Sequence, residues 1–400
     1  MTTDVLVIGG GAAGFFTAIN IAQQSALKVV IAERGKEVLS KVKISGGGRC
    51  NVTHAEFVPK ELAKNYPRGE RELNGPFHTF MSGDVMEWFD TRGVALKIEE
   101  DGRIFPESDS SQTIIDCFLS EAKKYGVTVL KGVPVKDIVP EDEGYKVQLG
   151  TDTVTAKKVV VATGSNPKIW KVLEALGHTI VPPVPSLFTF NCKHPLLKPI
   201  PGLATMALVK IPGTKLESVG PLLVTHWGFS GPAVLKLSAW GARALADKAY
   251  KFNIQVNWLH TVSFDEAMEV LKDCKEHQPK KNIGNTRVFD IPKRLWEGIV
   301  KELNLTEIRW ADVSKKQLNQ LATASTAATF TINGKSTFKE EFVTAGGVEL
   351  KEVNFKTFES KLHANLYLAG EVLNIDAITG GFNFQNAWTG GFIVAKAVVG

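Results

Sequence analysis

Residues 4–14, with the sequence DVLVIGGGAAG, constrain the fold of this 400-residue chain more than any other segment. Their first half is apolar, which is typical of a strand buried on both faces of a parallel sheet. Gly9, Gly11 and Gly14 follow in the spacing G-x-G-x-x-G, and residues 12–24 have the pattern of a helix. A second strand is expected at residues 28–33. The segment therefore predicts a strand–helix–strand unit that binds a dinucleotide.

Each glycine of this turn has a physical role in such a unit. Gly9 permits the tight turn, Gly11 lets the backbone approach a pyrophosphate, and Gly14 allows the helix to pack closely on the sheet. Glu33 ends the second strand, nineteen residues after Gly14. A carboxylate there accepts hydrogen bonds from ribose hydroxyls and repels a 2′-phosphate. This points to FAD or NAD and away from NADP, the alternative being a glycine turn in a nucleotide-free fold.

A second glycine-rich loop, SGGGRCN at residues 45–51, offers further phosphate-binding groups. Consecutive glycines expose backbone N–H groups, and the guanidinium of Arg49 suits phosphate oxygens. Two such loops in one domain suit a long cofactor such as FAD. The alternative is a flexible loop with a surface arginine, and the spacing alone does not separate FAD from NAD.

Five motifs together resemble a known family. They are GGGAAG at residues 9–14, SGGGRCN at 45–51, GRIFP at 102–106, THWGFSGP at 225–232 and AGEVLNIDAITGGFNFQNAWTGG at 369–391. The chain resembles, over essentially its whole length, the bacterial NAD(P)/FAD-dependent oxidoreductases that include aminoacetone oxidase and a flavin-dependent bile-acid dehydroreductase. Ser40 and His54 depart from the pattern, where the family has glycine and asparagine.

The resemblance implies non-covalent FAD and a set of residues that contact it. Those expected at the pyrophosphate and adenosine ribose are Gly9, Gly11, Ala12, Ala13, Gly14, Glu33 and Arg34. The backbone of Val135 is expected to contact the edge of the adenine. Those expected along the rest of the cofactor are Gly48, Arg49, Cys50, Asn51, Ala162, Thr163, Gly164, Gly370 and Glu371. Gly381, Phe382 and Asn383 are expected beside the isoalloxazine ring, where the start of the last helix favours the negative charge of reduced flavin.

The pattern of expected strands and helices also changes along the chain. Six prolines lie between Pro182 and Pro201, and short strands and helices without the strand–helix–strand rhythm follow. The rhythm returns near the C-terminus. We therefore expect an α/β fold in which a Rossmann-like FAD domain, with a parallel sheet and a small antiparallel sheet, spans residues 1–189 and 341–400. An inserted β-barrel and helical substrate domain is expected at residues 190–340.

These features favour an enzyme, an FAD-dependent oxidoreductase that acts on a small organic substrate. His226 and Arg103 are the candidate catalytic residues; a structural turn histidine and a salt-bridged arginine are the alternatives. A second G-x-G-x-x-G after a strand is absent, so a dedicated nicotinamide domain is not expected. Either the substrate reduces the flavin and oxygen reoxidises it, or NAD(P)H docks transiently and an unsaturated or keto substrate is reduced.

Composition bears on partners and compartment. A net charge of +5 is small for 400 residues, so we expect no nucleic-acid partner, although an RNA-modifying flavoprotein is an alternative of another class. The four cysteines are far apart in the sequence, which argues against a disulfide framework, a metal site and a dithiol redox centre. The same cysteine pattern suits a reducing compartment, so a cytoplasmic protein is expected. No membrane segment is expected, because the uncharged residues 5–22 are interrupted by glycines.

Overall fold

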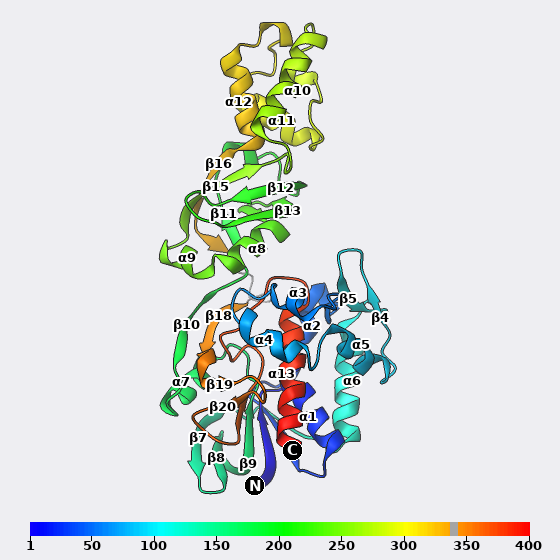
Figure 1. Cartoon of the computed structure of the whole chain (residues 1–400), viewed down its shortest axis with the longest axis vertical. Helices are drawn as coiled ribbons and strands as arrows, with labels where there is room; N and C mark the ends of the chain where they lie inside the picture. The colour runs from blue at the N-terminus through cyan, green and yellow to red at the C-terminus, as the bar shows by residue number, and fades with distance from the viewer. Residues whose placement is uncertain (337–342) are drawn as a thin grey trace. The chain divides into compact units, whose positions relative to one another are not determined.

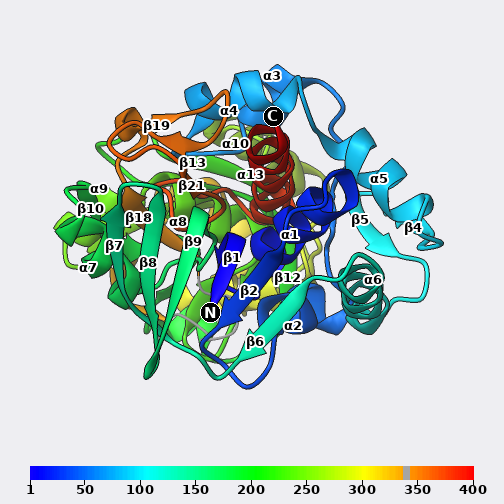
Figure 2. The same cartoon turned by 90° about the horizontal axis from the view of Figure 1, so that it is seen from below.

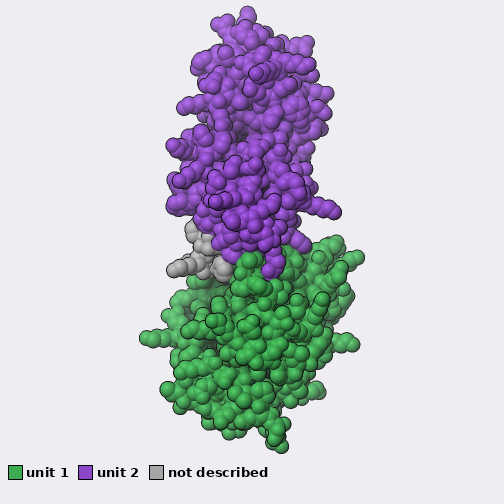
Figure 3. All heavy atoms as spheres, turned by 90° about the vertical axis from the view of Figure 1, so that its left-hand side faces the viewer, with its two compact units in different colours: residues 1–184, 343–400 green, residues 185–342 purple. Residues whose placement is uncertain are grey.

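The computed structural model describes residues 1–336 and 343–400. The chain forms two compact units, Met1–Val184 with Val343–Gly400, and Pro185–Phe342 (Figure 3). The expected domain boundary at residues 340 and 341 lies outside the described residues. Two strands, β10 (Ile180–Pro185) and β18 (Thr344–Val348), pair where the chain leaves and re-enters the first unit.

The first unit is built on a parallel sheet in the order β21-β9-β1-β2-β6. Its central strand, β1, pairs in parallel with β2 and with β9, so that Val5 lies between Val29 and Lys158. β7 and β8 extend the sheet as an antiparallel hairpin beside β9. Val5, Leu6 and Val7 are fully buried, as the apolar strand pattern predicts.

Helices cover this sheet on the side where α1 and α13 lie next to one another (Figures 1 and 2). Phe16 of α1 packs against Phe80, Trp88 and Trp388, which joins three helices into one aromatic core. A three-stranded antiparallel sheet, β3-β5-β4, forms a separate small layer of this unit.

The bounds in the first unit are as follows. The helices are α1 (Ala12–Gln24), α2 (Ser40–Gly48), α3 (Pro59–Ala63), α4 (Glu70–Phe77), α5 (Ser82–Asp90), α6 (Ser111–Lys124), α7 (Pro167–Ala175), η4 (Leu350–Glu352) and α13 (Phe382–Val399). The strands are β1 (Thr2–Ile8), β2 (Val29–Glu33), β3 (Thr53–His54), β4 (Leu96–Ile98), β5 (Arg103–Pro106), β6 (Thr128–Lys131), β7 (Val135–Glu141), β8 (Gly144–Leu149), β9 (Asp152–Val161), β19 (Val353–Asn354), β20 (Glu359–Ser360) and β21 (Leu366–Leu368).

The second unit contains an antiparallel barrel and a group of helices. Its sheet runs β16-β15-β12-β13-β14-β11-β17, and its two end strands are consecutive in sequence. β16 pairs with β15 and β17 pairs with β11, while Gly334 between them takes a φ of +135°. This single bent segment therefore closes the sheet into a barrel, as the inserted-barrel prediction requires.

Two helices of this unit, α10 and α12, begin at capping boxes. Ser263 and Glu266 form a capping box at the start of α10, and Ser314 and Gln317 form another at α12. The bounds are β11 (Thr189–Asn191), η1 (Pro195–Leu197), β12 (Ala204–Lys210), β13 (Glu217–Val224), β14 (Gly228–Ser230), α8 (Pro232–Trp240), α9 (Ala242–Asp247), β15 (Lys251–Asn257), α10 (Phe264–His277), η2 (Ile283–Asn285), α11 (Lys293–Glu302), η3 (Trp310–Asp312), α12 (Lys315–Thr326), β16 (Ala328–Asn333) and β17 (Lys335–Ser336).

Candidate functional site

The loops that follow three neighbouring parallel strands meet at one edge of the sheet. These loops begin after β1, β9 and β21, whose carboxyl ends share that edge. A Cβ atom placed on Gly9 would lie 2.4 Å from the carbonyl oxygen of Ala162, so the first two loops touch. A Cβ atom on Gly164 would lie 3.6 Å from Glu371 Oε2, which brings the third loop to the second. The predicted positions Ala162–Gly164 and Gly370–Glu371 are thus assembled around the first glycine turn.

The glycines of the first turn differ in what surrounds them, and this difference tests whether a pyrophosphate fits. A Cβ atom on Gly14 would lie 1.9 Å from the carbonyl oxygen of Gly9, so Gly14 is required by the fold itself. A Cβ atom on Gly11 would meet no other part of the protein within 4 Å. Gly11 is the N-cap of α1 and makes no side-chain cap, and Ala12 is half-buried. The open backbone at a helix N-terminus fits a phosphate group.

Glu33 is held beside this turn by two backbone hydrogen bonds. Its Oε2 accepts from the N–H of Gly10 and its Oε1 accepts from the N–H of Gly35, each at 2.7 Å. Each oxygen keeps a second lone pair, so the carboxylate can still accept hydrogen bonds from a ribose. The main chain of Glu33 also accepts a hydrogen bond from Val133, two residues before Val135 of β7. Val135 therefore lies near the predicted adenosine end, and the side chain of Arg34 is exposed.

The loop at residues 45–51 takes a strained path that glycine makes accessible. Gly46, Gly47 and Gly48 all have positive φ, and so does Cys50 at +62°. Cβ atoms on Gly47 and Gly48 would meet no protein atom within 4 Å, which leaves one side of the loop open for a ligand. Cys50 is fully buried, and this burial raises the pKa of its thiol to about 12. Cys50 is therefore a packing residue and holds no thiolate at neutral pH.

Asn51 connects this loop to the last helix. With the amide oriented by its hydrogen bonds, its nitrogen donates to the carbonyl of Thr53 and its oxygen accepts from the N–H of Gly381, each at 3.0 Å. Gly381 is the N-cap of α13 and takes a φ of +93°. The predicted cofactor loop and the predicted isoalloxazine loop are thus held together by one side chain.

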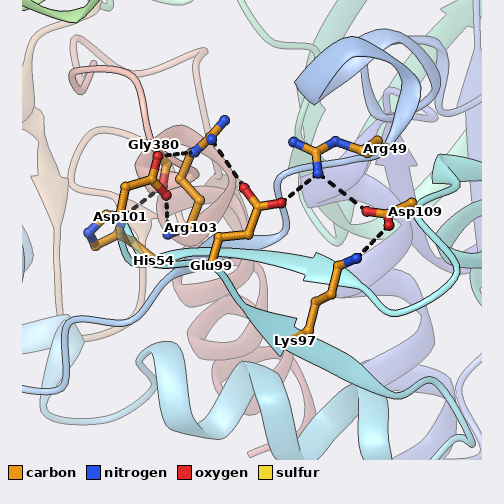
Figure 4. A network of polar contacts seen from close by, with 8 residues as sticks. All are labelled: Arg49, His54, Lys97, Glu99, Asp101, Arg103, Asp109 and Gly380. Atoms are coloured by element: carbon orange, nitrogen blue, oxygen red, sulfur yellow. Dashed lines mark hydrogen bonds and ion pairs between the residues drawn. The ribbon is translucent and has the colours of Figure 1, made fainter. Parts of the chain in front are cut away.

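Arg49 and Arg103 both point into a network of carboxylates (Figure 4). Arg49 donates to Glu99 Oε1 at 2.6 Å and to Asp109 at 3.3 Å. Arg103 donates to Asp101 at 2.8 Å and to Glu99 Oε2 at 3.1 Å. The carboxylate partners raise the pKa of Arg49 and keep its guanidinium charged. Glu99 therefore bridges the two arginines, and the salt-bridged alternative describes Arg103 in this structure.

Residues outside the sequence prediction fix the loop that precedes α13. The hydroxyl of buried Tyr66 donates to the carbonyl of Phe382 at 2.5 Å, and Arg68 forms an ion pair with buried Asp376. Asn383 Oδ1 accepts from the N–H of Ala377 at 3.0 Å, so its side chain also holds the loop.

His54 also lies against this loop. Its Nδ1 donates to the carbonyl of Gly380 at 3.1 Å, and its ring packs on Phe382 with the ring centres 4.5 Å apart. Burial lowers the pKa of His54. The departure from the family pattern at His54 was the sequence signal that could have marked this residue.

His226 lies in the second unit, in the turn between β13 and β14. Its side chain is exposed, and its neighbour Trp227 is 58% exposed. The two rings form an edge-on pair with centres 6.3 Å apart. Both side chains are therefore available to a ligand.

The described part of the chain contains no group of three His, Cys, Asp or Glu side chains suited to a metal ion. All four cysteines are free and buried. Within the same residues, no helix is long and apolar enough to cross a membrane.

Comparison with known proteins identifies the family. A family model described as the HI0933-like protein Rossmann domain matches residues 3–397. The chain belongs to this family. It is 30% identical to a protein of Escherichia coli (strain K12) named ribosomal RNA dihydrouridine synthase, over 99% of this chain and 98% of that protein. It is 28% identical to a protein of Clostridium scindens named 3-dehydro-bile acid delta(4,6)-reductase, over 98% of both.

A solved structure has the same fold. The 3-ketosteroid-delta4-(5alpha)-dehydrogenase of Rhodococcus jostii RHA1 superposes with a TM-score of 0.52 and 13% identity, covering 100% of this chain and 96% of that one. The predicted family and fold class are confirmed, and the HI0933-like protein is an FAD-dependent oxidoreductase. The likeness to aminoacetone oxidase, the site residues and the cytoplasmic location stay predictions.

Proposed function

We propose that this HI0933-like protein reduces a carbon–carbon double bond conjugated to a carbonyl group, with NAD(P)H as the electron donor and FAD as the carrier. One observation carries the proposal: two relatives matched over nearly their full length bear names that describe the same chemistry. Dihydrouridine is uridine with two hydrogens added across such a bond, and a delta(4,6)-reductase saturates such bonds in a keto steroid skeleton. The net reaction consumes one NAD(P)H and one proton.

The geometry of the first unit supports this chemistry. When bound, FAD supplies hydride transfer between donor and substrate. Gly11 and the start of α1 would hold its pyrophosphate, and Glu33 would hold its ribose. The start of α13, capped by Gly381 without a side-chain partner, presents N–H groups that favour negative charge on the reduced ring. Asn51 fixes this helix start relative to the loop at residues 45–51.

In this proposal, a side chain of the second unit binds the substrate. His226 and Trp227 combine an exposed imidazole with an exposed aromatic surface. Arg103 is less suited to hold a substrate, because it would have to give up Asp101 or Glu99 first. We therefore assign His226 to substrate binding and Arg103 to support of the cofactor loop.

Anaerobic absorbance spectroscopy tests the direction of electron flow. Purified FAD-loaded protein is mixed with NADH or NADPH, and the flavin band near about 450 nm is followed. We expect bleaching by one of the two nucleotides, followed by recovery of the band when a conjugated enone is added without oxygen. Bleaching by amine donors alone, with no response to either nucleotide, would contradict the proposal and favour the oxidase alternative.

Two kinds of molecule contain the bond in question. One is a small hydrophobic ketone, as in the name of the Clostridium scindens relative. The other is a uracil base within ribosomal RNA, as in the name of the Escherichia coli relative. The reduction of FAD by NAD(P)H, tested above, would be the same for either substrate.

A further inference from the structure

The small net charge of the chain conceals an uneven distribution. The whole chain has 47 Lys and Arg against 42 Asp and Glu, whereas residues 185–342 have 21 against 14. The barrel segments, residues 185–262 and 328–336, have nine basic residues and two acidic ones. The nine are Lys193, Lys198, Lys210, Lys215, Lys236, Arg243, Lys248, Lys251 and Lys335. The positive charge of the protein is therefore concentrated on its barrel.

One outer surface of this barrel, on β15 and β16, consists of hydrogen-bond donors and contains no carboxylate. The two strands pair residue by residue, so that their outward side chains form three rows across the sheet. The rows are Lys251 with Asn333, Asn253 with Thr331, and Gln255 with Thr329. Phe252, Ile254 and Val256 point the other way and are buried. We call the six outward residues the donor surface.

The donor surface is open along most of its length. Gln255 is half-buried, and the other five residues are exposed. Asn253 and Thr331 hydrogen bond to each other at 3.0 Å, which keeps the middle row in place. On the adjoining strand Lys210 pairs with Gln255 in the sheet and forms an ion pair with Glu217 at 3.0 Å.

A basic and aromatic group adjoins one end of this surface. Lys248 and Lys251 are both exposed and flank Tyr250. Lys335 of β17 lies over the ring of Tyr250, with its Nζ 5.0 Å from the ring centre. Asp247 precedes Lys248 and is the one carboxylate among the described residues 247–251 and 333–336. Three ammonium groups and one carboxylate leave a net positive end to the donor surface.

This combination fits the backbone of a polynucleotide. Lysine, asparagine, glutamine and threonine side chains donate hydrogen bonds to phosphate and sugar oxygens, and a carboxylate-free surface avoids repulsion of the phosphates. A small hydrophobic ketone would instead need an enclosed apolar pocket. We propose that the donor surface, with Lys248 and Lys335, binds the phosphodiester backbone of RNA. The proposal adds a substrate class to the proposed function. It rests on that function only for the statement that a base of the bound RNA is reduced.

Binding of RNA to the FAD-loaded full chain tests this inference without turnover. The probe is a fluorescein-labelled, uridine-containing single-stranded RNA, and its anisotropy is measured at several salt concentrations. The test variant carries Lys248→Glu and Lys251→Glu. The control carries Lys315→Glu and Lys316→Glu, two exposed lysines at the start of α12, where acidic side chains suit the helix.

We expect the wild type and the control to bind RNA alike. The test variant should bind at least about tenfold more weakly, and its plot of log affinity against log salt should be shallower by about 1.4, or about 0.7 for each phosphate that is no longer neutralised. A neutral variant, Lys251→Gln, should show about half that change in slope. Equal binding by the test variant and the control, no RNA binding by the wild type, or binding only to anionic lipid vesicles would each overturn the proposal.

The flavin half-reaction separates this inference from the proposed function. Reduction of the flavin by NAD(P)H and reoxidation by a small enone should be the same in the test variant and the wild type. If both variants lack the half-reaction but the test variant alone loses RNA binding, the reductase proposal fails and the RNA proposal stands. If the half-reaction is intact but the wild type does not bind RNA, the RNA proposal fails and the reductase proposal stands.

Discussion

Substitution of Gly11 by alanine distinguishes the effect of this position on stability from its effect on FAD binding. Gly11 has φ −94° and ψ −167°, an extended conformation that alanine adopts without strain. Its added Cβ atom would meet no other part of the protein within 4 Å. The cost to the protein without FAD is the poorer helix cap, about 0.5–1 kcal/mol. At about 2–4 °C per kcal/mol, the melting temperature should fall only slightly.

The same methyl group should weaken FAD binding much more. In our account the pyrophosphate lies against the backbone at Gly11, so the Cβ atom occupies the space of the closest approach. Overpacking of this kind costs about 1–3 kcal/mol, which corresponds to an affinity about 5–150-fold lower. Two further glycine-to-alanine variants serve as controls. Gly14→Ala should fail to fold because its Cβ atom would lie 1.9 Å from the Gly9 oxygen. Gly83→Ala, in α5 with only Phe57 near at 4.0 Å, should leave FAD affinity unchanged and should not lower stability.

Flavin fluorescence during titration of the FAD-free protein gives the affinity, and thermal unfolding of the same sample gives the stability. FAD affinity unchanged in Gly11→Ala would refute the placement of the pyrophosphate at this turn. A large loss of stability without FAD would show that the open space around Gly11 is not present in solution.

Three other substitutions test separate parts of the account. Glu33→Ala should weaken FAD binding about tenfold or more, because it removes charge-assisted hydrogen bonds of roughly 1.5–3 kcal/mol each; unchanged affinity would show that Glu33 does not contact the ribose. His226→Ala should keep FAD and the fold but lower kcat/KM at least about tenfold, or about 1.4 kcal/mol, and normal turnover would make His226 a structural residue. Burial lowers the pKa of His178 despite its hydrogen bond to Glu352, so the folded protein favours neutral imidazole and should lose stability as the pH falls below about 6.5. Unfolding measured between about pH 7 and 5 should show a weaker pH dependence in His178→Gln, and equal slopes would contradict this assignment.

Much of the cofactor domain could be predicted from its sequence because its signals are local. The predicted helix at residues 12–24 coincides with α1, since a glycine turn and an apolar run fix both of its ends. Gly9 and Gly14 are needed for close contacts of the backbone with itself, which no other residue permits. Such requirements are written in the identity and spacing of a few residues.

The contacts that depend on distant segments could not be predicted in this way. Arg49 was expected at a phosphate, yet its guanidinium meets Glu99 and Asp109, fifty and sixty residues away. Tyr66 reaches the start of α13 across more than three hundred residues. No local pattern marks such partners, because tertiary packing alone brings them together.

The distribution of charge over the surface could not be predicted for a related reason. The net charge of +5 averages a basic barrel with a more acidic remainder, so it is a poor measure of whether one surface suits a nucleic acid. Only the pairing of β15 with β16 shows that Lys251, Asn253 and their partners share one surface.

The central claim is that electrons leave the flavin into a conjugated carbon–carbon double bond. The most direct measurement is an anaerobic single turnover, in which the protein is reduced chemically, freed of reductant and mixed with an enone steroid or a uridine-containing RNA. We predict that the flavin band returns and that mass spectrometry finds one product molecule, with two hydrogens added, for each flavin reoxidised. Reoxidation only after oxygen is admitted, with both compounds recovered unchanged, would contradict the account.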